Sequence, residues 1–120
     1  MDLRCEIEGD LTCSFDRFLI ERAVYNLVNN AIPETPAGGE VTVRVRRAGD
    51  FAVLEVRDTG RGMPAYILEG VLRGDALSSK PGGTGLGTVI VKRVAEEHGG
   101  KLEGESKEGR GTTFRIMLPG

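Results

Sequence analysis

The sequence predicts an α+β fold, a two-layer sandwich in which about three helices cover one face of a mixed, mostly antiparallel sheet of about five strands. This prediction rests on short segments of alternating apolar and polar residues, which are typical of strands, and on apolar residues at helical spacing between them. The chain has 120 residues, the length of one domain, so we expect residues 1–120 to share one core and one site.

The first half of the chain is expected to form a hairpin of residues 3–8 and 11–14, a helix that runs to about residue 31, and strands 41–46 and 51–58. Ser14 or Asp16 is a candidate cap at the start of the helix. Pro33, Pro36 and the glycines that follow are expected to end it. The two strands alternate with period two and are joined by a turn at residues 48–50.

The second half is expected to form a short helix at about 64–72, a helix at 88–98, and strands 101–106 and 112–118. Gly85, Leu86 and Gly87 open the helix at 88, and two glycines after His98 end it. Residues 59–87 otherwise have weak periodicity and are expected to form a long loop.

Composition excludes several classes of protein. The formal net charge is −2 with 28% charged residues, which suggests neither a nucleic-acid-binding surface nor an acidic tail. No apolar run approaches the ~20 residues that span a bilayer, and the N-terminus has no signal-peptide pattern. We therefore expect a cytoplasmic domain without membrane contact of its own, even if a longer parent protein is membrane-anchored. Cys5 and Cys13 are expected to be free thiols.

Glycine-rich patterns and two asparagines are the candidate functional features. The 18 glycines are about twice the usual share and they cluster, which is typical of loops near a ligand. Four patterns follow one another along the chain: residues 26–31 (NLVNNA) on a helix, 58–63 (DTGRGM) after a strand, 83–87 (GTGLG) before a helix, and 109–112 (GRGT) before the last strand.

Asn26 and Asn30 are one helical turn apart, so their carboxamide oxygens can both reach one magnesium ion that also takes phosphate oxygens. The alternative is that they are ordinary exposed residues near a helix end. The glycine-rich run before Thr88 turns backbone N–H groups at a helix N-terminus towards an anion, which the helix dipole favours. By itself this glycine-rich run is weak evidence for a nucleotide-binding site, because it lacks the Lys-Ser/Thr of a P-loop.

Period two places Asp58 on the core side of its strand with Ala52, Leu54 and Val56. There its carboxylate can accept the exocyclic amino hydrogen of adenine, which the carbonyl of guanine cannot supply. Thr112 also points inward and can share this contact. The alternative is a turn aspartate that caps its own backbone before Gly60.

In this order and spacing, the four patterns resemble the N, G1 and G2 boxes and the terminal Gly-Thr of the Bergerat-type ATPase fold, which histidine kinases, gyrase, the Hsp90 chaperones and MutL share. Residues 80–87 (KPGGTGLG) and 95–100 (AEEHGG) are most similar to the sensor histidine kinase branch. The resemblance implies an ATP-binding catalytic domain with ATP and Mg²⁺ as cofactors and a lid over about residues 63–87.

The residues expected to hold the nucleotide are Asn26, Asn30, Asp58, Gly60, Gly62, Lys80, Gly83, Thr84, Gly85, Leu86, Gly87, Thr88 and Thr112. Gly60 and Gly62 are expected to leave room for a flat base beside the backbone. Lys80 matches a lysine of the family's lid that faces the phosphates, although a solvated lysine is an equal alternative.

The resemblance also implies transfer of the γ-phosphoryl group of ATP to a histidine on a separate dimerisation domain, with a response regulator downstream. His98 is the single histidine and is expected in the last turn of a helix, a poor place for the phosphorylated residue. The acceptor must therefore come from outside this chain, and the isolated chain is expected to turn ATP over slowly.

The chain departs from the family pattern in three places. Pro33 and Glu34 stand where a basic residue and then an aromatic residue or histidine are usual. The lid has Arg73, Ala76 and Leu77 at about the places of its usual phenylalanines, and Thr88 replaces a leucine or methionine. We expect nucleotide binding to survive these changes better than phosphoryl transfer.

Two other functions are compatible with parts of the sequence. One is an ATP-binding regulatory module without phosphotransfer, such as an anti-sigma-type regulator or a degenerate kinase. The other is a dimeric aspartic protease with Asp58, Thr59 and Gly60 as its half-site, which leaves the helix asparagines and the Gly-Leu-Gly run unexplained.

Overall fold

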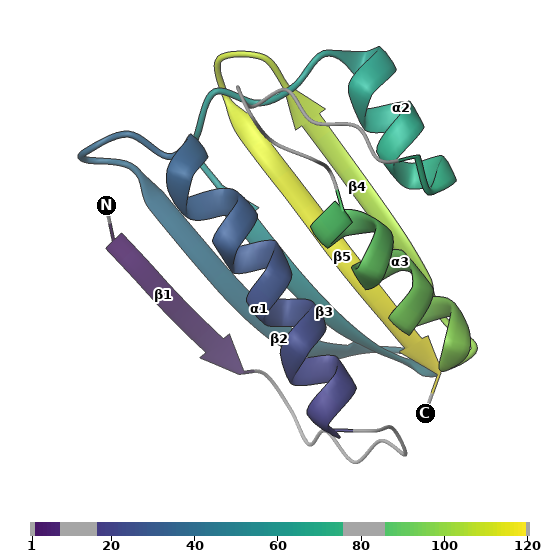
Figure 1. Ribbon diagram of the computed structural model, residues 1–120. Helices are drawn as coiled ribbons and strands as arrows, with labels where there is room; N and C mark the ends of the chain where they lie inside the picture. Colours follow the sequence, from purple (N-terminus) through teal and green to yellow (C-terminus); the bar gives the residue numbers. More distant parts are fainter. Residues whose placement is uncertain (1, 8–16, 76–85, 120) are drawn as a thin grey trace.

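The computed structural model describes residues 2–7, 17–75 and 86–119. In this part of the chain, five strands form one sheet in the order β1-β2-β3-β5-β4 (Figure 1). They are β1 (Asp2–Ile7), β2 (Glu40–Ala48), β3 (Phe51–Asp58), β4 (Lys101–Lys107) and β5 (Gly111–Pro119). β1 pairs with β2 in parallel, and all the other pairs are antiparallel. The predicted mixed, mostly antiparallel sheet is confirmed.

Three helices, α1 (Arg17–Glu34), α2 (Ala65–Arg73) and α3 (Leu86–Glu97), lie on one face of the sheet (Figure 1). Their apolar residues join the inward residues of the strands in one core cluster: Ala23, Leu27, Ala31, Val41, Ala52, Leu54, Val56, Ile67, Val71, Val91, Val94, Ala95, Leu102, Phe114, Ile116 and Leu118. The other face of the sheet is not covered by any described helix. The two predicted layers are therefore confirmed.

Strand register brings four residues into one row at the end of the sheet where β3 finishes. Asp58 pairs with Val41 of β2 and with Thr112 of β5, and Thr112 pairs with Ser106 of β4. Because side chains alternate between the two faces of a strand, all four point to the helix-covered face. This row positions the candidate site.

Helix α1 is longer than predicted. It continues to Glu34 and so includes Pro33, where the sequence predicted an end near Ala31. Proline lacks the N–H of a helical hydrogen bond, but near the last turn the loss affects only one carbonyl. The helix end is stabilised by Thr35, whose buried hydroxyl donates to the carbonyl oxygen of Ala31 at 2.8 Å. The first proline therefore lies within the last turn of α1 and does not end the helix.

The other element boundaries agree with the predictions to within a few residues. α3 begins at Leu86, two residues before the expected start at Thr88. α2 ends at Arg73 and is followed by Gly74, whose φ of 98° is a left-handed conformation that glycine adopts without strain.

The N-terminal hairpin is only partly described. Its first strand is confirmed as β1, and the partner that the structure describes for it is β2. The second hairpin strand and the candidate caps Ser14 and Asp16 lie outside the described residues. Among the helices of the described part, none has both the length and the apolar character needed to cross a membrane.

Candidate functional site

Asp58 is a buried carboxylate at the end of the central strand, with an exposed fraction of 8%. Its Oδ1 accepts hydrogen bonds from the backbone N–H of Gly60 at 2.9 Å and of Thr112 at 3.2 Å. The predicted orientation towards the core is confirmed. The contact with Gly60 is the turn cap that was the alternative, so Asp58 makes this contact and a second one to β5. The carboxylate is consequently held in one orientation.

Ser106 is a residue of this site that the sequence analysis missed. Its Oγ lies 2.8 Å from Oγ1 of Thr112, accepts the N–H of Met63 at 2.9 Å, and donates to the carbonyl oxygen of Gly111 at 3.1 Å. Ser106 lies on the same face of β4 as Leu102 and Gly104, because alternate residues of a strand share a face. This alternation was the one sign in the sequence that Ser106 points towards the core. The β4–β5 register was also needed to see that it faces Thr112.

Gly60 and Gly62 follow Asp58 in the turn after β3. Gly60 is buried. Gly62 has a φ of 69°, and a Cβ atom there would lie 2.1 Å from the carbonyl oxygen of Lys107. A side chain at Gly62 would therefore meet the backbone of the β4–β5 turn, which is a reason for glycine that does not involve a ligand. A contact of Gly60 and Gly62 with a bound base stays a prediction. The N–H of Gly109 also donates to the carbonyl oxygen of Arg61 at 2.7 Å, which joins the two turns.

The asparagines of α1 face the first turn of α3. A Cβ atom on Gly87 would lie 3.7 Å from Nδ2 of Asn30 and 3.9 Å from Cβ of Asn26. Nδ2 of Asn26 is buried and has no hydrogen-bond partner among the described residues. A buried N–H group without a partner is costly, so an acceptor brought to this amide would be stabilising. Thr88 is buried with an exposed fraction of 5%.

Several predicted site residues are not described. Lys80, Gly83, Thr84 and Gly85 lie outside the described residues, and Leu86 is described only as the first residue of α3. The glycine-rich segment therefore contributes to the described site only through Gly87 and Thr88.

The chain segments that follow α1 and β3 meet at one end of the sheet. The segment after α1 touches the segment after β3, because a Cβ on Gly39 would lie 3.0 Å from Oγ1 of Thr59. The N–H of Thr59 donates to the carbonyl oxygen of Glu40 at 3.0 Å. The structure thus brings Asp58 and Thr112 together directly, and Asn26, Asn30 and Gly87 together directly, with both groups on the helix-covered face.

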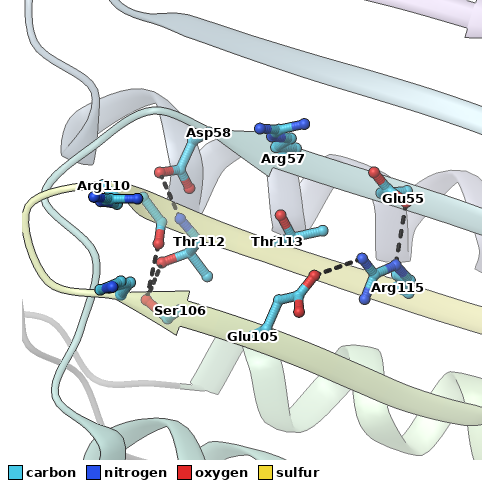
Figure 2. A pocket seen from close by; sticks show the side chains of 11 residues that line it. Glu55, Arg57, Asp58, Glu105, Ser106, Arg110, Thr112, Thr113 and Arg115 are labelled. Atoms are coloured by element: carbon cyan, nitrogen blue, oxygen red, sulfur yellow. Dashed lines mark hydrogen bonds and ion pairs between the residues drawn. The ribbon is translucent and has the colours of Figure 1, made fainter.

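A hollow of about 400 Å³ lies at the same strand ends (Figure 2). Outward residues of three strands line much of it, including Glu55, Arg57, Thr113 and Arg115. Nε of Arg115 lies 3.1 Å from Glu55, and its Nη2 lies 2.7 Å from Glu105. Asp58, Ser106 and Thr112 also line this hollow, whereas the asparagines of α1 do not. The hollow therefore includes the residues of the predicted base contact but not those of the predicted magnesium site.

Arg115 and Glu105 shift each other's protonation. The hydrogen bond from Arg115, together with its positive charge, lowers the pKa of Glu105 below its ordinary value. The hydrogen bond to Glu105 raises the pKa of Arg115. Glu105 is exposed, so solvent screens the pair and its contribution to stability is small.

His98 follows the last residue of α3, and its Nδ1 lies 2.8 Å from the carbonyl oxygen of Val94. Among the departures from the family pattern, Pro33 and Glu34 are in the last turn of α1, and Arg73 forms an exposed ion pair with Asp75 at 3.2 Å. Ala76 and Leu77 lie outside the described residues.

Comparison with known proteins identifies the family. Residues 15–120 match the model of the histidine kinase-, DNA gyrase B- and HSP90-like ATPases. The chain belongs to this ATPase family. Within the family, it is a catalytic ATPase domain of the sensor histidine kinase type, as its relatives indicate.

Curated relatives of this ATPase domain are sensor kinases. The domain is 36% identical over 115 residues to sporulation kinase C of Bacillus subtilis. The aligned region covers 96% of this chain and 25% of that kinase. The domain is 38% identical over 124 residues to the sensor-like histidine kinase SenX3 of Mycobacterium tuberculosis. This aligned region covers 99% of this chain and 30% of SenX3. The chain therefore spans less than a third of the length of either relative.

Solved structures of histidine kinases have the same fold as this ATPase domain. The catalytic domain of histidine kinase ThkA in a nucleotide-free form has a TM-score of 0.83 at 30% identity, covering 98% of this chain and 78% of that one. The mycobacterial sensor histidine kinase MprB has a TM-score of 0.83 at 31% identity, covering 99% of this chain and 83% of the MprB chain. Full-length ShkA in complex with AMPPNP has a TM-score of 0.84 at 25% identity, covering 98% of this chain and 25% of the ShkA chain.

Proposed function

We propose that this ATPase domain binds ATP with Mg²⁺ and, within a two-component sensor kinase, delivers the γ-phosphoryl group to a histidine on a separate dimerisation domain. A response regulator is the downstream partner. Family membership, the sensor-kinase relatives and the AMPPNP complex of ShkA support this function. The observation that carries it is the buried carboxylate of Asp58, held by backbone N–H groups beside Thr112.

Asp58 selects adenine in this proposal. Adenine has an exocyclic amino group that donates hydrogen bonds, whereas guanine and hypoxanthine have a carbonyl oxygen at that position. A carboxylate accepts hydrogen bonds and donates none when ionised, so it stabilises the amino group and repels the carbonyl. The two backbone hydrogen bonds to Oδ1 fix the carboxylate before a base arrives, which reduces the entropy lost on binding.

Asn26, Asn30 and Gly87 fit the phosphates and the magnesium ion. The buried Nδ2 of Asn26, without a partner among the described residues, suits a phosphate oxygen as acceptor. Carboxamide oxygens of Asn26 and Asn30 suit Mg²⁺, a hard cation that prefers oxygen ligands. Gly87 leaves the space between the two helices open, since a side chain there would fill it. The residues present therefore fit the cofactor that the family implies.

Phosphoryl transfer requires little covalent chemistry from this chain. ATP supplies the phosphoryl group, and catalysis of its transfer consists mainly of positioning and of neutralising charge. In this proposal Asp58 and Thr112 orient the base, and the asparagines hold the phosphate end. Lys80 and residues 83–88 complete the phosphate site within a lid at about residues 63–87. The histidine nucleophile belongs to the partner domain, and the reaction occurs in the cytoplasm without contact to nucleic acid or membrane.

Calorimetric titration with ADP and AMPPNP, with and without Mg²⁺, tests the base assignment in the unmodified chain and in Asp58→Asn. Asparagine keeps Oδ1 as acceptor for the N–H groups of Gly60 and Thr112 but replaces the other oxygen by a donor. A lost hydrogen bond to a charged group predicts about 10- to 150-fold weaker binding. Glu105→Gln is the matched control, because it removes the same charge on the opposite face of the sheet. Unchanged affinity in folded Asp58→Asn would refute the assignment.

A regulatory module that binds ATP without phosphotransfer is the second candidate, and Pro33 and Glu34 in the last turn of α1 favour it. Mixing the domain with γ-labelled ATP and its dimerisation domain separates the two functions. Label on the histidine of the dimerisation domain supports the kinase. ATP binding with an unlabelled histidine supports the regulatory module.

A further inference from the structure

The hydroxyl of Ser106 is the meeting point of three segments of the candidate site. It contacts the N–H of Met63 after β3, the carbonyl oxygen of Gly111 at the start of β5, and the hydroxyl of Thr112. The three distances are 2.9, 3.1 and 2.8 Å, all within the range of good hydrogen bonds. Figure 2 shows Ser106 and Thr112 facing each other across β4 and β5.

Counting protons fixes the direction of these hydrogen bonds. A serine hydroxyl donates one hydrogen bond and accepts two. Met63 can only donate through its N–H, and Gly111 can only accept through its carbonyl. Ser106 therefore satisfies all three contacts at once only if it gives its own proton to Gly111 and accepts from both Met63 and Thr112. In this arrangement the proton of the Thr112 hydroxyl points at Ser106.

The direction of the Thr112 hydroxyl decides what a bound base meets. With its proton engaged by Ser106, Oγ1 of Thr112 presents only lone pairs to a ligand. Asp58, whose Oδ1 accepts the N–H of Thr112, is also an acceptor when ionised. The edge of the site beside these two residues therefore offers acceptors, which match an amino group and oppose a carbonyl oxygen.

We infer that Ser106 is a positioning residue for base selectivity: it holds the hydroxyl proton of Thr112 away from the base, so that 6-amino purines bind and 6-oxo purines are rejected. This inference rests on the proposed function, in which adenine lies against Asp58 and Thr112. Without the Ser106 oxygen, the Thr112 hydroxyl is released to donate to a 6-oxo group. The selectivity for 6-amino over 6-oxo purines then falls, although Asp58 is unchanged.

The test is the ratio of the dissociation constants for IDP and ADP, measured by calorimetry on the 120-residue chain. Ser106→Ala is expected to lower this ratio about threefold to tenfold, the effect of one neutral hydrogen bond. Ser106→Thr keeps the hydroxyl and suits a strand, so it is expected to retain the ratio. If Ser106→Ala fails to fold, Ser106→Cys, whose thiol is a weak hydrogen-bonding group, replaces it with the same expectation.

A second variant links the effect to Thr112. Thr112→Val has no hydroxyl proton to release, so adding Ser106→Ala to it is expected to leave the ratio unchanged. If Ser106→Ala weakens IDP and ADP binding equally, Ser106 has only a structural role and the inference is wrong. If the unmodified chain does not prefer ADP over IDP, the proposed base assignment itself has failed. The two failures are therefore distinguishable.

Discussion

The carboxylate of Asp58 accepts a hydrogen bond from the backbone N–H of Thr112 at 3.2 Å, although 54 positions separate the two residues in the sequence. Register makes this contact possible, because Asp58 and Thr112 are direct partners in the β3–β5 pair. The end of the central strand and the start of its neighbour thus form one polar unit on an otherwise apolar face.

Gly111→Ala is expected to destabilise the domain severely. Gly111 has a φ of 125°, and a Cβ atom there would lie 2.0 Å from the backbone oxygen of Asp58, which cannot move independently of β3. Gly109→Ala is the matched control, because Gly109 has a φ of 81° and open space around it. Backbone strain alone costs about 1–3 kcal/mol in either variant. Urea unfolding should show a clearly larger loss for Gly111→Ala, and equal losses would contradict the predicted clash.

Asn26→Leu is expected to stabilise the nucleotide-free domain and to weaken binding of Mg·ATP. The buried Nδ2 of Asn26 has no partner among the described residues, and removing such a group recovers about 1–3 kcal/mol of folding free energy. Asn29→Leu, at an exposed position of the same helix, controls for the change in helix propensity. Urea unfolding and calorimetry measure the two effects. Equal stabilisation by both variants would show that burial of the amide is not the cause.

Gly87→Ala is expected to leave folding intact while it weakens nucleotide binding. The new Cβ would make only ordinary van der Waals contacts with Asn26 and Asn30, and alanine is a better helix former than glycine by about 1 kcal/mol. It would nevertheless fill the space proposed for the phosphate end. Thermal melting should show equal or greater stability, while calorimetry shows weaker AMPPNP binding. Adenosine, which has no phosphates, is the matched ligand and should bind with unchanged affinity.

Glu105→Gln is expected to destabilise the domain slightly at neutral pH, and this difference is expected to fade as the pH falls below the ordinary carboxyl pKa. Because Arg115 lowers the pKa of Glu105 in the folded state, the stabilisation is present above the ordinary carboxyl pKa. This stabilisation is lost as the pH falls through the lowered pKa of Glu105. The difference between the urea midpoints of the variant and the unmodified chain should therefore shrink below about pH 4. Glu108→Gln, an exposed carboxylate in the neighbouring turn, is the control, and an equal response in both variants would argue against the Arg115 contact.

Periodicity predicted the parts of the fold that depend on one strand at a time. β3 occupies residues 51–58 as expected, and the inward orientation of Asp58 follows from strict alternation over eight residues. Pairing between strands was harder, because alternation does not reveal a strand's partner. The parallel pairing of β1 with β2 and the contact of Ser106 with Thr112 both depend on register, and the sequence analysis predicted neither.

Local stop signals were less reliable than periodicity. The prolines after Ala31 suggested a helix end, but α1 continues to Glu34, and the Thr35 hydroxyl donates to the carbonyl oxygen of Ala31. For Gly62, the sequence indicated a glycine that leaves room for a bound base, and that contact stays a prediction. The sequence could not show that the neighbouring atom belongs to the backbone of Lys107, since the two residues meet only through the tertiary fold.

Strand β3 carries the apolar side chains of the core and the carboxylate proposed to face the base on the same alternating face. If β3 slipped by one position, every side chain would change faces, so Asp58 would turn outward together with the inward apolar row. Nucleotide affinity is consequently an assay of correct strand alignment in this domain. Misaligned molecules that retain their helices and strands should pass unretained through a column of immobilised ATP.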